Sequence, residues 1–272
     1  MRNRLWLGLL VAGPMSPALF RVSNLHAHLG PVASASLRVA SRLANRLKAG
    51  TAVQLENLRQ ADLILISGPE RDFPELLKLS LASGIDWRGR TAILLDFRRD
   101  TSALAPLRAL GASIGTLDSL DAFPEPRFVA DADHHARRRL RRFATATSSS
   151  IFYLEPGRKQ LFAAGSAFTG MLLMPLVAAT VDCLKKAGLT QSEALLIAER
   201  NTLHTLRSWL KSGRKGWTGT LPDRDLEGVR RQLQALKAQN EALPDYFANT
   251  SRLALSLFGE DPAWLDSLDG EK

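Results

Sequence analysis

The order of apolar and helical segments constrains the fold of this chain more than any other feature of its sequence. In the first half, short apolar runs such as residues 62–66 alternate with stretches of helical periodicity. This alternation is typical of a parallel sheet covered by helices. After Glu155-Pro156-Gly157 only helical patterns follow. The sequence therefore predicts an α/β domain over residues 1–156 and an all-α domain over residues 157–272.

Turn and capping residues divide these two regions into elements. We expect a helix that Ser16 caps, that begins at Pro17 and that Gly30 closes, because Ser favours the N-cap and Pro the first turn. The pair Thr190 and Glu193 forms a capping box that predicts a helix running toward Ser212. The expected strands lie at residues 5–11, 32–34, 62–66, 91–95 and 149–154.

Composition limits the functions that the chain can have. A single cysteine, Cys183, excludes an internal disulfide and a zinc site built on cysteine pairs. The histidines are not spaced to share a metal or a catalytic triad, so we expect no metal site. The net charge of +9 includes a basic run at residues 134–142. No aromatic residue interrupts that run, which favours a solvated helix face and leaves nucleic acid a minor alternative.

The segment 161–181 contains no charged residue, and its length alone would suit a transmembrane helix. Gly165, Gly170 and Pro175 dilute it, and amphipathic helices of a soluble type flank it. We therefore expect a cytoplasmic protein without a membrane span, in which this segment is buried in the core or across the two-fold axis of a homodimer. The basic start before residues 5–11 resembles a signal peptide but is better explained by a first buried strand.

The turn after the first expected strand is where a dinucleotide would bind. It reads Val11-Ala12-Gly13-Pro14-Met15-Ser16 and keeps one of the three glycines that such a turn needs. Val11 and Pro14 crowd the approach of a pyrophosphate, and Pro14 lacks an amide donor. Ser34, Ser36, Arg38 and Arg42 follow the second strand and could hold the ribose phosphate of NADP, although Ser36 could equally cap a helix and the arginines could be solvated. The candidate cofactor-binding residues are Ala12, Gly13, Met15, Ser16, Ser34, Ser36, Arg38, Ser67 and Gly68.

Several stretches resemble a known bacterial group. They are residues 105–112 (APLRALGA), 186–189 (KAGL) and Thr218-Gly219 followed by Asp225. Through them, the chain resembles Rossmann-like NAD(P)-binding proteins of the ketopantoate and pyrroline-carboxylate reductase type, whose helical C-terminal domain of unknown function is similar to that of 6-phosphogluconate dehydrogenase. This resemblance implies a Rossmann-like domain that binds NAD(P), with NADP a doubtful candidate for the cofactor of this chain, and a helical domain, through which we expect a homodimer.

The chain departs from that group along the expected cleft. Asp96-Phe97-Arg98-Arg99 replaces His-Thr-Ser-Gly, Asp118-Ser119 replaces His-Pro, Phe162-Ala163 replaces Tyr-His, and Gly170-Met171 replaces Ser-Asn. Hydride transfer needs a held cofactor and a placed proton donor. We therefore expect a degenerate relative with weakened or lost hydride transfer.

Two alternatives remain open at this point. One is an active NADP-dependent oxidoreductase on a small molecule, in which Asp96 and Asp118 at strand ends act as acid and base. The same two carboxylates would serve equally well as helix caps or solvated loop residues. The other alternative is a non-catalytic interaction or ligand-binding protein.

Overall fold

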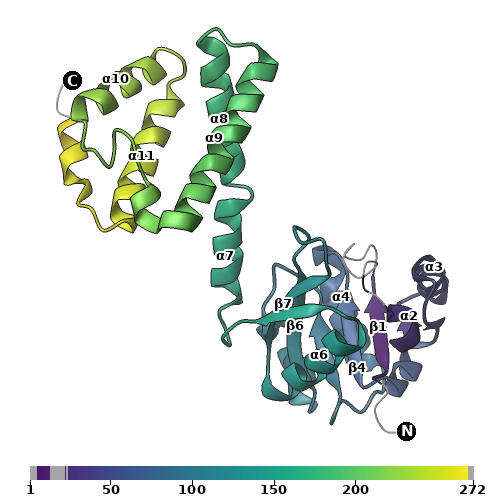
Figure 1. Cartoon of the computed structure of the whole chain (residues 1–272). Helices are drawn as coiled ribbons and strands as arrows, with labels where there is room; N and C mark the ends of the chain where they lie inside the picture. Colours follow the sequence, from purple (N-terminus) through teal and green to yellow (C-terminus); the bar gives the residue numbers. More distant parts are fainter. Residues whose placement is uncertain (1–4, 13–21, 23, 269–272) are drawn as a thin grey trace. The chain divides into compact units, whose positions relative to one another are not determined.

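The computed structural model describes residues 5–12, 22 and 24–268 of the chain (Figure 1). It divides into two compact units, an N-terminal unit over Met1–Ser166 and a helical unit over Ala167–Lys272. The division falls inside helix α7 (Lys159–Thr169), because the first turns of that helix pack on the N-terminal unit. The last strand ends at Tyr153, close to the expected domain boundary at Pro156.

The N-terminal unit is built on one eight-stranded sheet in the order β3-β2-β1-β4-β5-β6-β7-β8. Neighbouring strands are parallel except β6 and β7, which form an antiparallel pair. The strands are β1 Leu7–Val11, β2 Leu29–Ala33, β3 Thr51–Ala52, β4 Leu63–Ser67, β5 Thr91–Leu94, β6 Ser113–Ser119, β7 Arg127–Ala132 and β8 Ser150–Tyr153. The predicted parallel sheet with a helical second unit is confirmed, with more strands than the sequence indicated.

Helices cover both faces of this sheet. Along β1, Leu9 contributes to the core on one face and Leu10 to the core on the other, as alternation in a strand requires. One face packs against α2, α3 and α6, and the other against η1, α4, η3 and α5. These elements are α2 Leu25–His28, α3 Leu37–Leu47, η1 Leu55–Gln60, η2 Glu70–Asp72, α4 Phe73–Ala82, η3 Thr101–Leu104, α5 Ala105–Ala109 and α6 His134–Ala146.

One local prediction was wrong. The helix expected to continue to Gly30 ends earlier, because Leu29 and Gly30 already belong to β2, where Leu29 pairs with Leu7 of β1. Strand pairing therefore outweighs the apolar helical spacing there. Ser16 and Pro17, at the expected start of that helix, lie outside the described residues.

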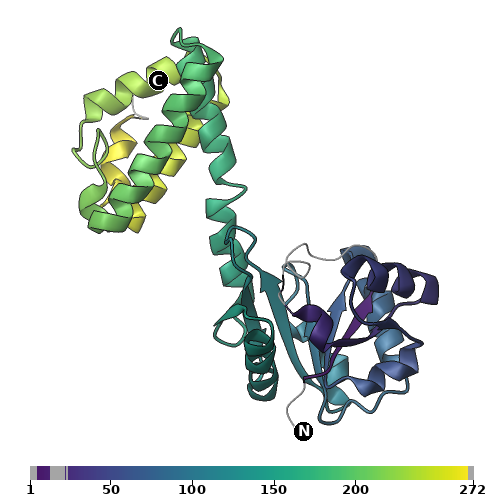
Figure 2. The same ribbon diagram turned by 45° about the vertical axis from the view of Figure 1, so that its right-hand side comes forward.

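The helical unit contains the rest of α7 and the helices that follow it. Thr190 and Glu193 form the predicted capping box at the start of α9, which runs to Ser212 as expected. Figure 2 shows α8 and α9 side by side as an antiparallel pair. A small core joins Val229, Leu255 and Leu265. The elements are α8 Leu173–Lys186, α9 Gln191–Ser212, η4 Gly213–Gly216, α10 Leu226–Lys237, α11 Ala242–Leu257 and η5 Pro262–Leu268.

Candidate functional site

The strand order changes direction between β1 and β4, and a crevice forms at such a point in doubly wound sheets. There the amide of Ala12 donates a hydrogen bond to the carbonyl of Ser67 at 2.9 Å. A Cβ on Gly68 would lie 2.8 Å from the carbonyl oxygen of Ala12, so only glycine allows this close approach. The structure thus brings together three candidate cofactor-binding residues. Gly13, Met15 and Ser16 lie outside the described residues.

Val11 was expected to crowd a pyrophosphate. It is the last residue of β1, pairs with Ser67 and is 1% exposed in the core beneath α3 and α6. Its side chain therefore contributes to packing. The crowding of the turn itself stays a prediction, because Pro14 lies outside the residues that the structure describes.

The second group of candidates lies where β2 leads into α3. Ser34 is buried, whereas Ser36, Arg38 and Arg42 are exposed. Ser36 occupies the N-cap position of α3, but its side chain makes no capping hydrogen bond. From Ser34 to Arg42 the sequence contains no carboxylate. Two hydroxyls, two guanidinium groups and a helix N-terminus make this corner suitable for a phosphate and unsuitable for an acidic contact to a ribose hydroxyl.

The two carboxylates singled out from the sequence lie at the ends of neighbouring parallel strands. Asp96 follows β5 and Asp118 is near the end of β6. The Asp96 carboxylate accepts a hydrogen bond from the amide of Arg98 at 2.8 Å and pairs with Arg99 at 2.5 Å. Asp96 therefore has the local loop role that was one of its two interpretations.

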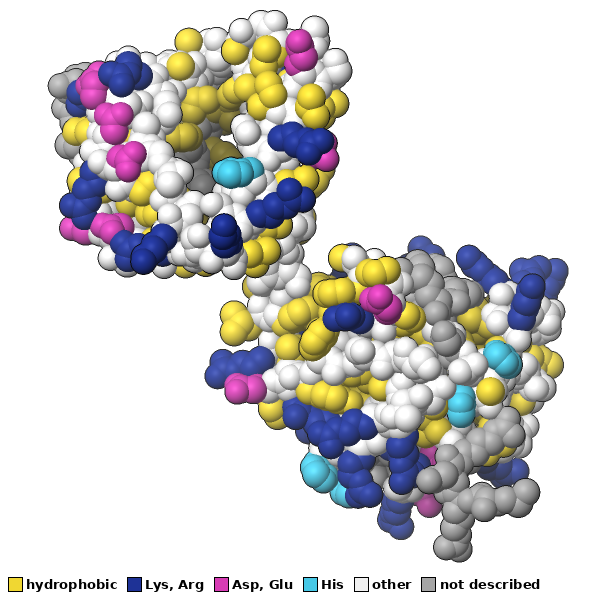
Figure 3. Space-filling view, viewed as in Figure 1, with side chains coloured by type: hydrophobic (Ala, Val, Ile, Leu, Met, Phe, Trp, Pro, Cys, Tyr) yellow, Lys and Arg dark blue, Asp and Glu magenta, His cyan; other side chains and the backbone are white. Residues whose placement is uncertain are grey.

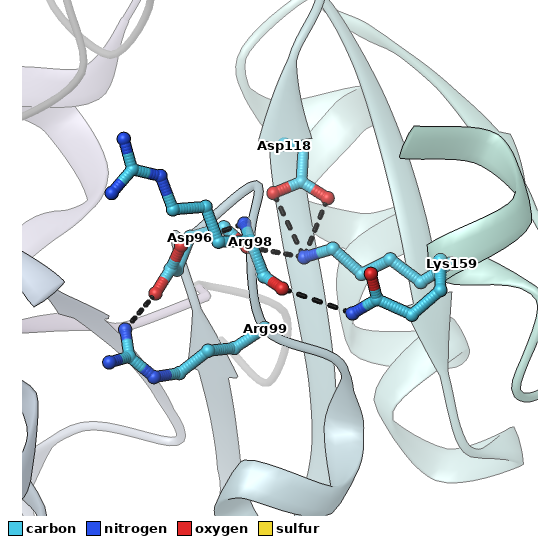
Figure 4. A network of polar contacts seen from close by, with 6 residues as sticks. Asp96, Arg98, Arg99, Asp118 and Lys159 are labelled. Carbon is cyan, nitrogen blue, oxygen red and sulfur yellow. Dashed lines mark hydrogen bonds and ion pairs between the residues drawn. The ribbon is translucent and has the colours of Figure 1, made fainter. Parts of the chain in front are cut away.

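Asp118 has a different environment, because Lys159 at the start of α7 lies against it (Figure 4). The Lys159 ammonium is 2.9 Å and 3.1 Å from the two Asp118 carboxylate oxygens and also donates to the carbonyl of Asp96. Both side chains are almost fully buried, with 1% and 2% exposed. The interpretation of Asp118 as a cap or a solvated loop residue was wrong, because it forms a buried ion pair.

Sequence analysis missed Lys159 as part of this site. A lone lysine ahead of an uncharged helix has no pattern that distinguishes it from a solvated one. The available signal was indirect, since two carboxylates at adjacent strand ends call for a nearby positive charge. Helix α7 begins at this edge of the sheet, and the side-chain amide of Gln160 donates a hydrogen bond to the carbonyl of Arg98 at 3.0 Å.

Burial shifts the acidity of this cluster. Loss of solvation raises the pKa of Asp118 to about 6, against the opposing effect of the Lys159 charge and hydrogen bond. Burial also raises the pKa of Asp131, which lies on β7 opposite Thr116 of β6. A cavity of about 160 Å³ opens beside Asp96, Asp118 and Phe128. The strand ends therefore carry a carboxyl group that can change its charge near neutral pH.

The uncharged segment behaves differently from what its sequence predicted. Leu161, Phe168 and Met174 are 68%, 60% and 65% exposed, and no residue of α8 is buried. The expectation that this segment lies in the core of the chain was wrong, because few side chains of the helical unit cover it. Lys159–Lys186 is long and apolar enough to cross a membrane by length and composition, and none of its most apolar window is buried. Residues 170–172 interrupt it, so that α7 and α8 are separate helices.

The helical unit is also hollowed. A cavity of about 680 Å³ lies between α8, α10 and α11, lined mainly by apolar side chains such as Leu176, Leu236 and Phe247. Figure 3 shows this hollow with hydrophobic side chains around it. Apolar surface is therefore exposed both on the long helices and in the concavity of this unit.

Comparison with known proteins fits this architecture. Residues 127–252 match a domain of unknown function, DUF2520. No curated protein matches the chain. The fold is Rossmann-like, with a parallel-sheet unit followed by a helical unit. Among solved structures, a proposed oxidoreductase from Pseudomonas putida has a TM-score of 0.72 at 14% identity, with 99% of each chain covered.

Two further solved structures are of a proposed NADP oxidoreductase and of a reductase that contains NADP⁺. A proposed NADP oxidoreductase from Bacteroides fragilis has a TM-score of 0.69 at 17% identity, and the match covers 92% of this chain and 97% of that one. An imine reductase from Myxococcus stipitatus in complex with NADP⁺ has a TM-score of 0.64 at 15% identity, covering 97% and 99%. At these identities the likeness establishes the fold, a Rossmann-like unit followed by a helical unit. The chemistry has to be inferred from the residues of the site.

Proposed function

We propose that the protein is a reductase-like dinucleotide-binding protein with weakened affinity for NADP and with hydride transfer weakened or lost. The observation that carries this proposal is the buried pair of Lys159 and Asp118. The two groups form a buried ion pair at the strand ends, with a hydrogen bond from the Lys159 ammonium to Asp118 Oδ1, whereas a reductase needs a proton donor there that is free to meet the substrate. The ammonium also donates to the carbonyl of Asp96, which fixes it further.

NADP, rather than NAD, fits the residues that remain. Ser34, Ser36 and Arg38 would hold the 2′-phosphate at the N-terminus of α3, and Ala12, Ser67 and Gly68 would border the pyrophosphate. The nicotinamide would supply the hydride when bound. Structural relatives in complex with NADP⁺ and, for a variant, NAD⁺ support a nicotinamide cofactor, and the residues of the α3 corner support the choice of NADP. Loss of two glycines from the first turn supports a lower affinity.

Titration of the purified protein with NADPH and NADH tests this proposal. We expect NADPH to bind more tightly than NADH, with a dissociation constant above about 100 μM, in the weaker half of the usual range of KM values. Arg38→Gln should remove most of the preference for NADPH, because it removes a guanidinium from the phosphate corner. The matched control Arg46→Gln, on the last turn of the same helix, should keep the preference. Equal affinity for both cofactors in the parent protein would contradict the assignment.

The raised pKa of Asp118 favours one alternative, an active NADP-dependent reductase of a small molecule. A carboxyl group with a pKa of about 6 beside a cavity can donate a proton near neutral pH. Because the structural relatives include imine reductases, imines are the substrates to assay. Oxidation of NADPH that depends on such a substrate and is abolished in Asp118→Asn would establish this alternative in place of the degenerate site.

We also propose that the protein is a cytoplasmic homodimer that pairs through its helical unit. The exposed apolar side chains of α7 and α8 support this, since soluble monomers rarely expose contiguous apolar surface of this kind. Gly165 and the alanines of α8 allow close approach of a second helix. Each helix is also shorter than the roughly 20 residues that span a bilayer. The mass in solution and the membrane fraction of expressing cells distinguish these outcomes.

A further inference from the structure

A basic pocket lies at the edge of the sheet opposite to the strand ends discussed above. Its volume is about 390 Å³. Thr91 and Ser113, the first residues of β5 and β6, form one side of it, together with the glycines that precede these strands. The first half of α6 forms the other side. All of its lining residues belong to the N-terminal unit, so the pocket is complete within one unit.

The side chains from α6 give this pocket its charge. His135, Arg138, Arg139 and Arg142 line it, spaced so that they share one face of the helix. Arg139 is 3.7 Å from the carboxylate of Asp62, which satisfies part of its charge. For Arg138 and Arg142, no carboxylate lies within ion-pair distance among the described residues. In Figure 3, Lys and Arg side chains gather with a histidine over the part of this unit that α6 occupies in Figure 1.

The opposite side of the pocket keeps its backbone open to a ligand. Gly89 has a φ of +73°, and a Cβ there would meet nothing within 4 Å. Gly111 has a φ of +94°, and a Cβ there would lie 2.8 Å from Arg88. Both backbone conformations favour glycine, and at Gly89 the space beside the backbone is open. Thr91 and Ser113 line the same pocket as the arginines, and a hydroxyl group can donate a hydrogen bond to an anion.

We propose that this pocket binds a compact polyanion with two adjacent phosphate groups, such as a pyrophosphate or a nucleoside polyphosphate. Arg138 and Arg142 lie one helical turn apart, so their guanidinium groups can each contact one phosphate in a forked geometry. The lining contains no carboxylate that would repel such a ligand. Its volume is within the usual range of small-molecule sites.

The same observations argue against a nucleic acid as the occupant. No aromatic residue lines the pocket, so bases have no platform on which to stack. The pocket is also distinct from the proposed dinucleotide crevice, because the two lie at opposite ends of the parallel strands. Strand β6 runs between these ends, with Ser113 at the pocket and Asp118 near the other end. The pocket depends on neither NADP binding nor hydride transfer.

Calorimetric titration with inorganic pyrophosphate tests the proposal. At about 100 mM salt, the parent protein should bind pyrophosphate at least about tenfold more tightly than orthophosphate, because two arginines engage two phosphates. The double variant Arg138→Gln, Arg142→Gln should lose about 100-fold or more in affinity, since each arginine makes charge-assisted hydrogen bonds. Both residues are exposed, so their replacement leaves the core intact.

The matched control is Arg141→Gln, an exposed arginine on the same helix that does not line the pocket. It lowers the net charge without touching the site and should keep pyrophosphate affinity within about twofold of the parent. NADPH affinity should likewise be unchanged in the double variant, which separates this site from the dinucleotide crevice. The proposal is overturned if pyrophosphate does not bind, if the control weakens binding as much as the double variant, or if single-stranded DNA binds more tightly than pyrophosphate.

Discussion

The two units of this chain satisfy their apolar residues in opposite ways. The N-terminal unit buries its strands on both faces, so that Leu7, Ile64 and Leu65 are almost completely hidden. In the helical unit, α8 has no buried residue, although it begins within the uncharged segment 161–181. The difference shows that an apolar segment indicates that its side chains are buried, but not whether the same chain or a second chain buries them. The first unit buries most of its strand residues within itself, whereas the second leaves large apolar side chains of its long helices exposed.

The strongest test of this contrast is a charge on the exposed face of α8. Met174→Asp should dissociate the proposed homodimer, because a carboxylate buried in an apolar interface costs several kcal/mol and about 100-fold or more in association. Met174 is 65% exposed, so the fold of the single chain should survive. Sedimentation velocity measures the change in mass. Thr145→Asp on α6 of the N-terminal unit is the control and should remain dimeric, whereas a monomeric parent protein would refute the pairing.

The second test removes a charge from the interior of the N-terminal unit. Lys159→Met should destabilise the N-terminal unit by about 3–5 kcal/mol, because it leaves the Asp118 carboxylate buried without its cation. The combination with Asp118→Leu should recover most of this loss, since it removes the unpaired charge. Hydrogen exchange of the β5 and β6 amides reports the change. If the single and double variants were equally unstable, the ion pair would not be what holds α7 to the sheet.

A smaller effect follows from the pKa of Asp118. Because this pKa rises to about 6 in the folded protein from an ordinary 3.8, the folded chain binds the proton more tightly between these values. The free energy of unfolding of the parent should therefore rise, relative to Asp118→Asn, as the pH is lowered through about 6. The gain should be about 2 kcal/mol once the pH is near 4. Denaturant unfolding across this pH range measures it, and parallel profiles for both proteins would contradict the shift.

The smallest effect lies in the helical unit, where a local cap supports a helix. Thr190 accepts a hydrogen bond from the amide of Glu193, and the Glu193 carboxylate accepts one from the amide of Thr190 at 2.8 Å. Thr190→Ala should destabilise α9 by about 1 kcal/mol. Thr145→Ala is the control, because that hydroxyl only bonds back to its own helix. Faster exchange of the first amides of α9 in Thr190→Ala alone is the expected result.

Local chemistry made some of these features predictable and left others hidden. The parallel sheet, the capping box at Thr190 and the polar corner at Ser34 follow from runs, spacings and residue types that act over a few positions. The pairing of Asp118 with Lys159 joins residues 41 positions apart, and no local pattern records it. Strands β6 and β7 were missed because β6 mixes Thr116 and Asp118 with apolar residues. The exposure of α8 was missed because the composition of a segment indicates that it is buried but does not indicate what buries it.

Strand β6 connects two chemically unlike ends of the same sheet. Ser113 begins it at the basic pocket, and Asp118 lies near its other end, about 17 Å away at the usual rise per residue. The strand pairs with β5 over residues 113–116 and with β7 over residues 115–119, and it joins the two proposed sites through the sheet. Thermodynamics then requires reciprocity: whatever factor an anion at one edge applies to the affinity for a ligand at the other edge, that ligand must apply to the anion. Measuring the effect of each ligand on the affinity for the other therefore tests whether the two ends of this strand are coupled.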